Sequence, residues 1–446
     1  MVHVSSAEDI IIALGICYAE NAPVALRSTV GHSYIGQSTA NGGIIISFWG
    51  LKELVVTEED GRYIAKLGVA DLASGGGRGL LSARYGLSAD RVIAAEVVVY
   101  DREEGKFELV TATGYNEHLD LLFAVRGGMG GNYGALVSLS YDTFPVTNVV
   151  VISGKNSDCM MHSDAAGPEI FGIGKFLGGG GIQYCIVNTV RSVFATPLVI
   201  AQLAKLDALE AVVGLPHPLR IEQDFGKAMW FWADCTGHPG VDFYPPEGIA
   251  SCSEEELKEA MDKCLYFDRD VNGGPNKAKS IYFPEDMCVQ ELRTLAEAAV
   301  DPVCQSPSDC AILLDFCGHA MVREPDDCNQ SAGKCTSFDH RAPGWHMQIL
   351  VFWEKDKATP IEKLEWLRET YESAFPGSLG TAYQNYIDSD LADGREWIGQ
   401  YFPNAGTYPR LQQVKCRYNA IDMFNFEAVD LMTINIDDSI SRAGTG

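Results

Sequence analysis

The chain has 446 residues, of which 46% are hydrophobic and 21% are charged, and this composition excludes a disordered chain, a coiled coil and a collagen-like fibre. The 60 acidic residues outnumber the 34 basic ones, so the net charge of −26 repels nucleic acids and anionic membrane surfaces. We therefore expect a globular protein of roughly two or three lobes that binds neither nucleic acid nor membrane.

The N-terminal part alternates between helix and strand patterns. Ser5 and Glu8 match a capping box, and apolar residues from 10 to 18 recur at helical spacing, which predicts an amphipathic helix. Apolar and β-branched runs predict strands at 23–26, 43–46, 91–100 and 107–110. The last two runs flank Gly105 and predict a hairpin.

Two glycine-dense loops, 75–79 and 127–134, lie between these elements. Because glycine has no Cβ, backbone N–H groups in such loops can approach a diphosphate closely. Neither loop has the full context of the Rossmann fingerprint, so together they predict a dinucleotide site of another design. A third glycine-rich segment, 172–181, lacks the spacing of a phosphate loop and is interpreted as a flexible loop.

From about residue 150 the pattern changes to longer strand-like runs mixed with helical segments, which predicts a second, α+β domain. Strand-like runs lie at 183–190 and 230–232, and helix-like segments at 253–264 and 360–374. Thr359 is the expected N-cap of the last helix, with Pro360 at its first position.

Eight of the 13 cysteines cluster in one stretch: Cys252, Cys264, Cys288, Cys304, Cys310, Cys317, Cys328 and Cys335. Their spacing does not match a zinc site, so we expect disulfides and no metal. A glycosylation sequon begins at Asn329 in the same stretch. Both signals favour a secreted protein or one in the secretory lumen, although no signal peptide follows Met1, and buried free thiols in a reducing compartment are the alternative.

Several segments, in this order along the chain, resemble the motifs of one family. They are 27–34 (RSTVGHSY), 75–92 (GGGRGLLSARYGLSADRV), 122–146, 338–341 (FDHR), 348–353 (QILVFW), 383–388 (YQNYID) and 410–424. Together they resemble the berberine bridge enzyme-like FAD-linked oxidases, in the vanillyl-alcohol oxidase superfamily with its PCMH-type FAD-binding domain. The resemblance implies an α+β fold. It divides the chain into an FAD-binding domain at 1–147, a substrate domain with an antiparallel sheet flanked by helices at 148–395, and a C-terminal segment at 396–430 that returns to the FAD domain.

The resemblance implies a covalent bond between FAD and the ring of His32, which raises the redox potential of the flavin. An isolated histidine in such a loop is more often structural, but Arg27, Ser33 and Tyr34 flank this one as in the family motif. No cysteine lies between Cys17 and Cys159, so we expect a single covalent link. The remaining residues that the resemblance places at the FAD are Arg27, Ser28, Gly31, Ser33, Gly75, Gly76, Gly77, Gly79, Gly131, Asn132, Gly134 and Asn385.

The resemblance assigns Tyr383 as the catalytic base, His346 and Gln348 as its substrate-polarising partners, and Tyr386 as its rival. If these residues lie in strands, alternation places His346 with Gln348 on one face, and Tyr383 with Asn385 on another. The same alternation sends Tyr386 into the opposite layer.

The implied reaction is oxidation of a small-molecule alcohol, such as a carbohydrate, an aromatic alcohol or a secondary metabolite, with an amine carbon as the other possible site of oxidation. Hydride passes to flavin N5, and dioxygen reoxidises the flavin to give hydrogen peroxide. One alternative is a dehydrogenase that uses another electron acceptor. The other follows from the short interval between His32 and Gly75: a degenerate family member that no longer binds FAD, acting as a secreted binding protein or remaining without function.

Overall fold

The computed structural model describes residues 1–28, 38–68, 74–79, 81–144, 148–155, 170–177, 181–190, 219–223, 253, 275–287, 289–304, 310–325, 335–354, 358–391, 396–419 and 421–424. The predicted strand at 230–232, nearly all of the predicted helix at 253–264 and the sequon at Asn329 lie outside these residues.

The chain begins with β1 (Val2–His3), a strand of a small parallel sheet of order β1-β3-β2. Helix α1 (Ala7–Ala19) follows and packs beside this sheet. The other strands of this sheet are β2 (Val24–Arg27) and β3 (Ile44–Ser47). The predicted first helix is confirmed, but its N-cap is Ser6, whose Oγ accepts the N–H of Asp9 at 3.1 Å. Asp9 in turn accepts the N–H of Ser5 at 2.9 Å, so Asp9, rather than Glu8, caps the backbone.

A second, antiparallel sheet has the strand order β4-β5-β8-β6-β7. Its strands are β4 (Leu54–Glu59), β5 (Arg62–Gly68), β6 (Val92–Asp101), β7 (Lys106–Thr113) and β8 (Ala135–Asp142). The helices between these strands are α2 (Ser82–Tyr85), α3 (Ser88–Arg91) and α4 (Leu119–Val125). The predicted hairpin is confirmed, because β6 and β7 pair from Asp101 and Lys106 up to Ala94 and Thr113.

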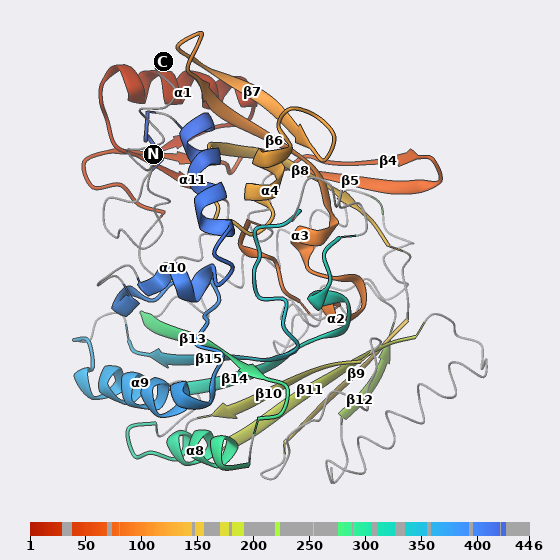
Figure 1. The fold of residues 1–446 in the computed structure, drawn as a ribbon, viewed down its shortest axis with the longest axis vertical. Coiled ribbons are helices and arrows are strands. Elements are labelled where there is room, and N and C mark those ends of the chain that lie inside the picture. Colours follow the sequence, from red (N-terminus) through yellow and green to blue (C-terminus); the bar gives the residue numbers. More distant parts are fainter. Residues whose placement is uncertain are drawn as a thin grey trace.

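A third sheet, also antiparallel, has seven strands in the order β12-β9-β11-β10-β14-β15-β13. Its strands are β9 (Asn148–Lys155), β10 (Ile170–Leu177), β11 (Gly181–Val190), β12 (Leu219–Gln223), β13 (Asn276–Pro284), β14 (Cys310–Cys317) and β15 (Gly344–Phe352). Helices α8 (Val289–Ala299) and α9 (Ile361–Ala374) cover one face of it (Figure 1). Short 3-10 helices lie at η4 (His319–Val322) and η6 (Phe375–Gly377).

Two local predictions for this sheet were wrong in part. Most of the segment 172–181, expected to be a loop, belongs to β10, which pairs with β11 on one side and β14 on the other. Backbone hydrogen bonds to two neighbours outweigh the poor strand propensity of glycine. Helix α9 is confirmed, but it begins at Ile361 with Pro360 as its N-cap, one residue later than expected.

The C-terminal elements pack against the N-terminal part of the chain. They are η7 (Ser389–Leu391), α10 (Glu396–Tyr401) and α11 (Thr407–Tyr418). Trp397, Tyr401 and Leu411 share one buried core with Leu121 of α4 and Leu139 of β8. Figure 1 shows α11 beside α4, next to the sheet that contains β6.

The described cysteines include both bonded and free thiols. Cys304 and Cys310 form a disulfide, and Cys335 is also disulfide-bonded, which confirms disulfides in the cysteine-rich stretch. Cys17, Cys317 and Cys416 are free and buried. Among the helices of the described ranges, none combines the length and apolar character needed to cross a membrane.

Candidate active site

One face of the seven-stranded sheet carries a row of polar side chains. Tyr282, His346 and Asp315 are directly opposite one another in β13, β15 and β14, so they share a face. Ser280 and Gln348 form the next row on the same face, two residues along. This confirms the expected pairing of His346 with Gln348. The other face is apolar and packs against α8 and α9 through residues that include Ile281, Phe283, Phe316, Trp345 and Ile349.

A turn that carries Tyr383 and Tyr386 lies over this polar face. The Tyr386 N–H donates to the Tyr383 carbonyl at 2.9 Å, so the segment is a turn and not a strand. The two rings meet edge-on with centroids 5.1 Å apart, and they lie 5.4 and 5.3 Å from the ring of His346. The expectation that Tyr386 points into the opposite layer was therefore wrong, because side-chain alternation applies only to an extended chain.

The hydroxyl of Tyr383 is held by a neighbouring amide. Asn385 Nδ2 donates to Tyr383 Oη at 2.8 Å, and the Tyr383 N–H donates to Ser280 Oγ at 2.9 Å. Burial raises the pKa of Tyr383 to about 12, although the charge of Arg78 and the Asn385 hydrogen bond both lower it. The amide of Asn385 occupies the place that a Cβ at Gly75 would take, so only glycine fits there.

Arg78 reaches into the same site from the first glycine loop. Its guanidinium forms an ion pair with Asp315, lies 3.8 Å from Cys317 Sγ, and stands 5.7 Å from the centre of the Tyr383 ring. Asp315 Oδ2 is 3.7 Å from His346 Nδ1. Burial, reinforced by the Arg78 charge, lowers the pKa of His346 to about 3, so this imidazole is neutral at physiological pH.

Sequence reasoning missed Arg78 and Asp315. One local signal was available: Arg78 is the single residue with a side chain in the glycine run 75–79, and that side chain is charged. Asp315 has no such signal. Its role depends on the pairing of β14 with β15, which places it opposite His346.

A buried ion pair anchors the turn of Tyr383 and Tyr386 to β13. Lys279 Nζ lies 2.5 Å from Asp388 Oδ2, and both side chains are 4% exposed. The Lys279 ammonium also stands 4.7 Å from the centre of the Tyr371 ring, and the Asp388 N–H donates to Tyr401 Oη at 3.0 Å. The segment that follows Tyr386 is thus tied to both β13 and α10.

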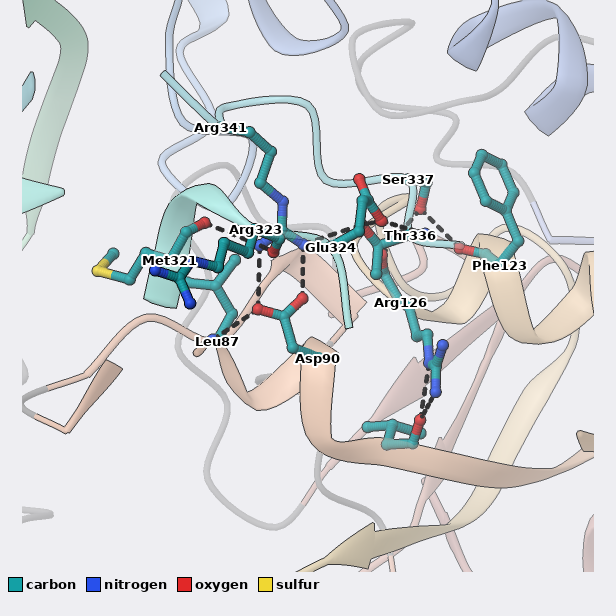
Figure 2. Close-up of polar contacts among 11 residues, drawn as sticks. Leu87, Asp90, Phe123, Arg126, Met321, Arg323, Glu324, Thr336, Ser337 and Arg341 are labelled. Atoms are coloured by element: carbon teal, nitrogen blue, oxygen red, sulfur yellow. Dashed lines mark hydrogen bonds and ion pairs between the residues drawn. The ribbon is translucent and has the colours of Figure 1, made fainter. Parts of the chain in front are cut away.

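A loop that follows residue 334 joins this site to the N-terminal part (Figure 2). Arg341 makes a bidentate contact with Asp90 of α3, at 3.0 and 2.5 Å. It also donates to Thr336 Oγ1 at 2.9 Å, and Thr336 donates to Glu324 at 3.0 Å. Ser337 Oγ, with distances of 2.8, 3.3 and 3.1 Å, contacts three carbonyl oxygens at the C-terminal end of α4. The loop therefore caps α4 and holds α3 at once.

Known proteins share this sequence pattern and fold. Residues 382–428, which carry the tyrosine turn, match the family described as "Berberine and berberine like". The monolignol oxidoreductase AtBBE-like 13 of Arabidopsis thaliana is 25% identical over 81% of this chain and 64% of its own length. The solved structure of BBE-like #28 from Arabidopsis thaliana superposes with a TM-score of 0.74 at 18% identity, over 98% of this chain and 91% of that one. The chain is thus similar to berberine bridge enzyme-like proteins over most of its length, and residues 382–428 match the family model itself. The predicted α+β fold class is confirmed, because the chain has the fold of this solved structure and the sheet expected in the substrate domain is antiparallel.

The chain is also similar to a bacterial protein whose name includes the cofactor FAD. An uncharacterised FAD-linked oxidoreductase of Bacillus subtilis is 28% identical over 34% of this chain and 39% of its own length. The chain thus spans less than two thirds of the length of either relative.

The family's FAD contacts, carried over by resemblance, fall into three groups in this structure. His32, Gly31 and Ser33 lie outside the described residues, whereas Arg27 and Ser28 lie at the end of β2. Gly75 lies against Asn385, whose amide donates to Tyr383, and Gly76, Gly77 and Gly79 follow in the same loop. Gly131, Asn132 and Gly134 belong to the second glycine loop. That loop is joined to the first because the Met129 N–H donates to the Ser74 carbonyl at 3.0 Å.

The glycines of both loops serve different purposes. A Cβ at Gly76 would collide with the ring of Phe338, and one at Gly134 would collide with the Val98 carbonyl of β6. Both residues also have positive φ, at 115° and 154°. Gly79 alone, among the loop glycines whose surroundings the structure describes, has no atom within 4 Å of its Cβ position. The loop 75–79 is therefore packed by protein at one end and open at the other.

Proposed function

We propose that this chain is an FAD-dependent oxidoreductase that oxidises a small-molecule alcohol. The observation that carries the proposal is that His346 of β15 meets Tyr383 and Asn385 of the turn beside the glycine loop that holds Arg78. A phenol hydrogen-bonded by an amide, beside a neutral imidazole and a buried cation, suits proton removal from a hydroxyl group.

The residues present fit a flavin at the open end of the loop 75–79. No atom lies within 4 Å of the Cβ position of Gly79, so the backbone there is accessible to a bound group, and the Asn385 amide lies directly against Gly75 in the same loop. Arg27, Ser28, the loop glycines, Asn132 and Asn385 would hold FAD, with His32 as the covalent attachment. Bound FAD supplies the hydride acceptor. We assign this role to residues 1–147 with 396–430, and substrate binding to 148–395.

In this proposal Tyr383 takes the hydroxyl proton of the substrate. The N–H of Asn385 points at its oxygen and stabilises the phenolate that must form first, and the Arg78 cation acts in the same direction. His346 and Gln348, on one face of β15, orient the substrate oxygen. Tyr386 stays the rival base, because it touches the same imidazole and its own pKa is raised by burial.

The electron acceptor and the location of the protein are also proposals. Dioxygen is the proposed acceptor, giving hydrogen peroxide, with a dehydrogenase as the alternative. A secreted or secretory-lumen protein is supported by the disulfide between Cys304 and Cys310, since such bonds persist in oxidising compartments.

One observation favours the second candidate, a binding protein that has lost FAD. Protein atoms already occupy the Cβ positions of Gly75 and Gly76, through Asn385 and Phe338, which leaves Gly79 as the open part of this loop.

The visible absorption spectrum of the purified chain decides between the two candidates. Flavin bands that persist in the pellet after acid precipitation support the covalent flavoenzyme. Colourless protein that stays colourless after refolding with FAD, while remaining folded by circular dichroism, supports the binding protein.

A further inference from the structure

Two polar groups in the candidate active site are buried without a hydrogen-bond partner among the described residues. They are the hydroxyl of Tyr282, a residue 3% exposed, and the ring nitrogens of His346, which is 0% exposed. Because Tyr282 and His346 are directly opposite in β13 and β15, their rings lie 4.9 Å apart. The nearest carboxylate, that of Asp315, lies 3.7 Å from His346 Nδ1, beyond hydrogen-bond distance, and forms an ion pair with Arg78.

Such groups normally find a partner, because leaving a buried donor or acceptor unpaired gives up the hydrogen bonds that water provided. Two unpaired groups side by side, on the face that carries Gln348 and that the Tyr383 turn covers, therefore point to a partner that is not part of the chain. The ring of Tyr386 is only partly buried and lies 5.3 Å from His346.

The pair carries no charge at physiological pH. Burial raises the pKa of Tyr282 well above its ordinary value and lowers that of His346 to about 3. Other groups face the pair from neighbouring elements. Arg78 and Asp315 neutralise each other, and burial raises the pKa of the facing groups Cys317, Tyr383 and Tyr386. The pair thus offers one hydroxyl donor, one ring donor and one ring acceptor, and the nearest charges, those of Arg78 and Asp315, are paired with each other.

We propose that Tyr282 and His346 form a neutral hydrogen-bonding pair that binds an uncharged oxygen of the substrate and so selects alcohols over amines and carboxylic acids. This inference rests on the proposed function. The physical reason is desolvation: an ammonium or carboxylate loses its hydration on entering and finds no free opposite charge, whereas a hydroxyl exchanges hydrogen bonds almost evenly.

The test uses three ligands with the same phenyl group and no hydride to give: 2-phenyl-2-propanol, the corresponding amine and benzoate. Binding to the full chain, with whatever flavin it carries, is measured by calorimetry. We expect the alcohol to bind at least about tenfold more tightly than either ion. Since no ligand can be oxidised, this result is independent of turnover, and failure of the proposed function is detected separately in the flavin spectrum. Equal affinities, or tighter binding of an ion, would overturn the inference.

Tyr282→Phe tests the residue itself. Losing one hydrogen bond between uncharged groups should weaken alcohol binding about three- to tenfold. The same variant should unfold at a higher temperature than wild type without ligand, because it removes an unpaired buried hydroxyl. The matched control is Tyr371→Phe, whose hydroxyl bonds to Gln400 at 3.2 Å on the far side of the sheet and which should leave alcohol affinity unchanged.

Two outcomes of the variant experiment count against the pair. A lower unfolding temperature for Tyr282→Phe would mean that the hydroxyl already has a partner within the protein. An altered flavin spectrum with unchanged alcohol affinity would assign the pair to the cofactor instead of the substrate.

Discussion

If Tyr383 is the base, the rate of flavin reduction should rise with pH through the neutral range. Burial raises its pKa to about 12, so at pH 8 only about one molecule in 10⁴ carries the phenolate. Below that pKa the phenolate fraction grows about tenfold per pH unit. The logarithm of the rate should therefore increase with a slope near one, without a plateau. His346, with a pKa of about 3, should add no second limb between pH 6 and 9.

Two substitutions give the magnitude. Tyr383→Phe removes the base and should slow flavin reduction by about a hundred- to ten-thousandfold at a fixed pH. Asn385→Ala removes the N–H that donates to Tyr383 Oη at 2.8 Å. A hydrogen bond to an ionised group is worth more than one between neutral groups, so we expect a further rise in the pKa of Tyr383 and a rate lower by about ten- to a hundredfold. The slope against pH should persist in Asn385→Ala.

The assay is anaerobic stopped-flow reduction of the enzyme-bound flavin by an excess of an aromatic alcohol, between pH 6 and 9. Tyr386→Phe is the matched control, because both tyrosine rings lie beside His346 and Tyr383 is the one that accepts the Asn385 hydrogen bond. We expect a loss of less than tenfold for this control. A pH-independent rate, or a larger loss in Tyr386→Phe than in Tyr383→Phe, would refute the assignment.

Three further predictions concern the supports of the site. Asp90→Asn should lower the free energy of unfolding by about 3 kcal/mol, because it leaves the partly buried Arg341 without its counter-ion; an unchanged urea midpoint would contradict this. Lys279→Met should leave Asp388 buried and uncompensated, with a lower thermal midpoint that Lys279→Arg restores at least in part; full stability of the methionine variant would show that the pair does not hold the turn. His32→Ala should release all flavin on denaturation, and flavin retained by the denatured variant would place the covalent link elsewhere.

The local elements and the family could be predicted from the sequence, because their signals lie within short windows. Two apolar runs around Gly105 predict the hairpin of β6 and β7, and helical spacing after a proline predicts α9. The family motifs are likewise short and appear in order along the chain. Local signals gave a wrong prediction where strand pairing between distant segments opposed them. At β10 the glycines predicted a loop, but pairing with β11 and β14 holds them in a strand.

The composition of the candidate site was decided by tertiary structure. Local periodicity placed His346 with Gln348 correctly, because both lie in one strand. It could not show that Tyr383 and Tyr386 occupy a turn, or that strand register sets Tyr282 and Asp315 on either side of His346. Register depends on pairing between segments far apart in the chain, and the ionisation of the grouped side chains depends on the burial that pairing creates. Sequence determined which residues were available, and the packing of the sheet against the glycine loop decided which of them meet.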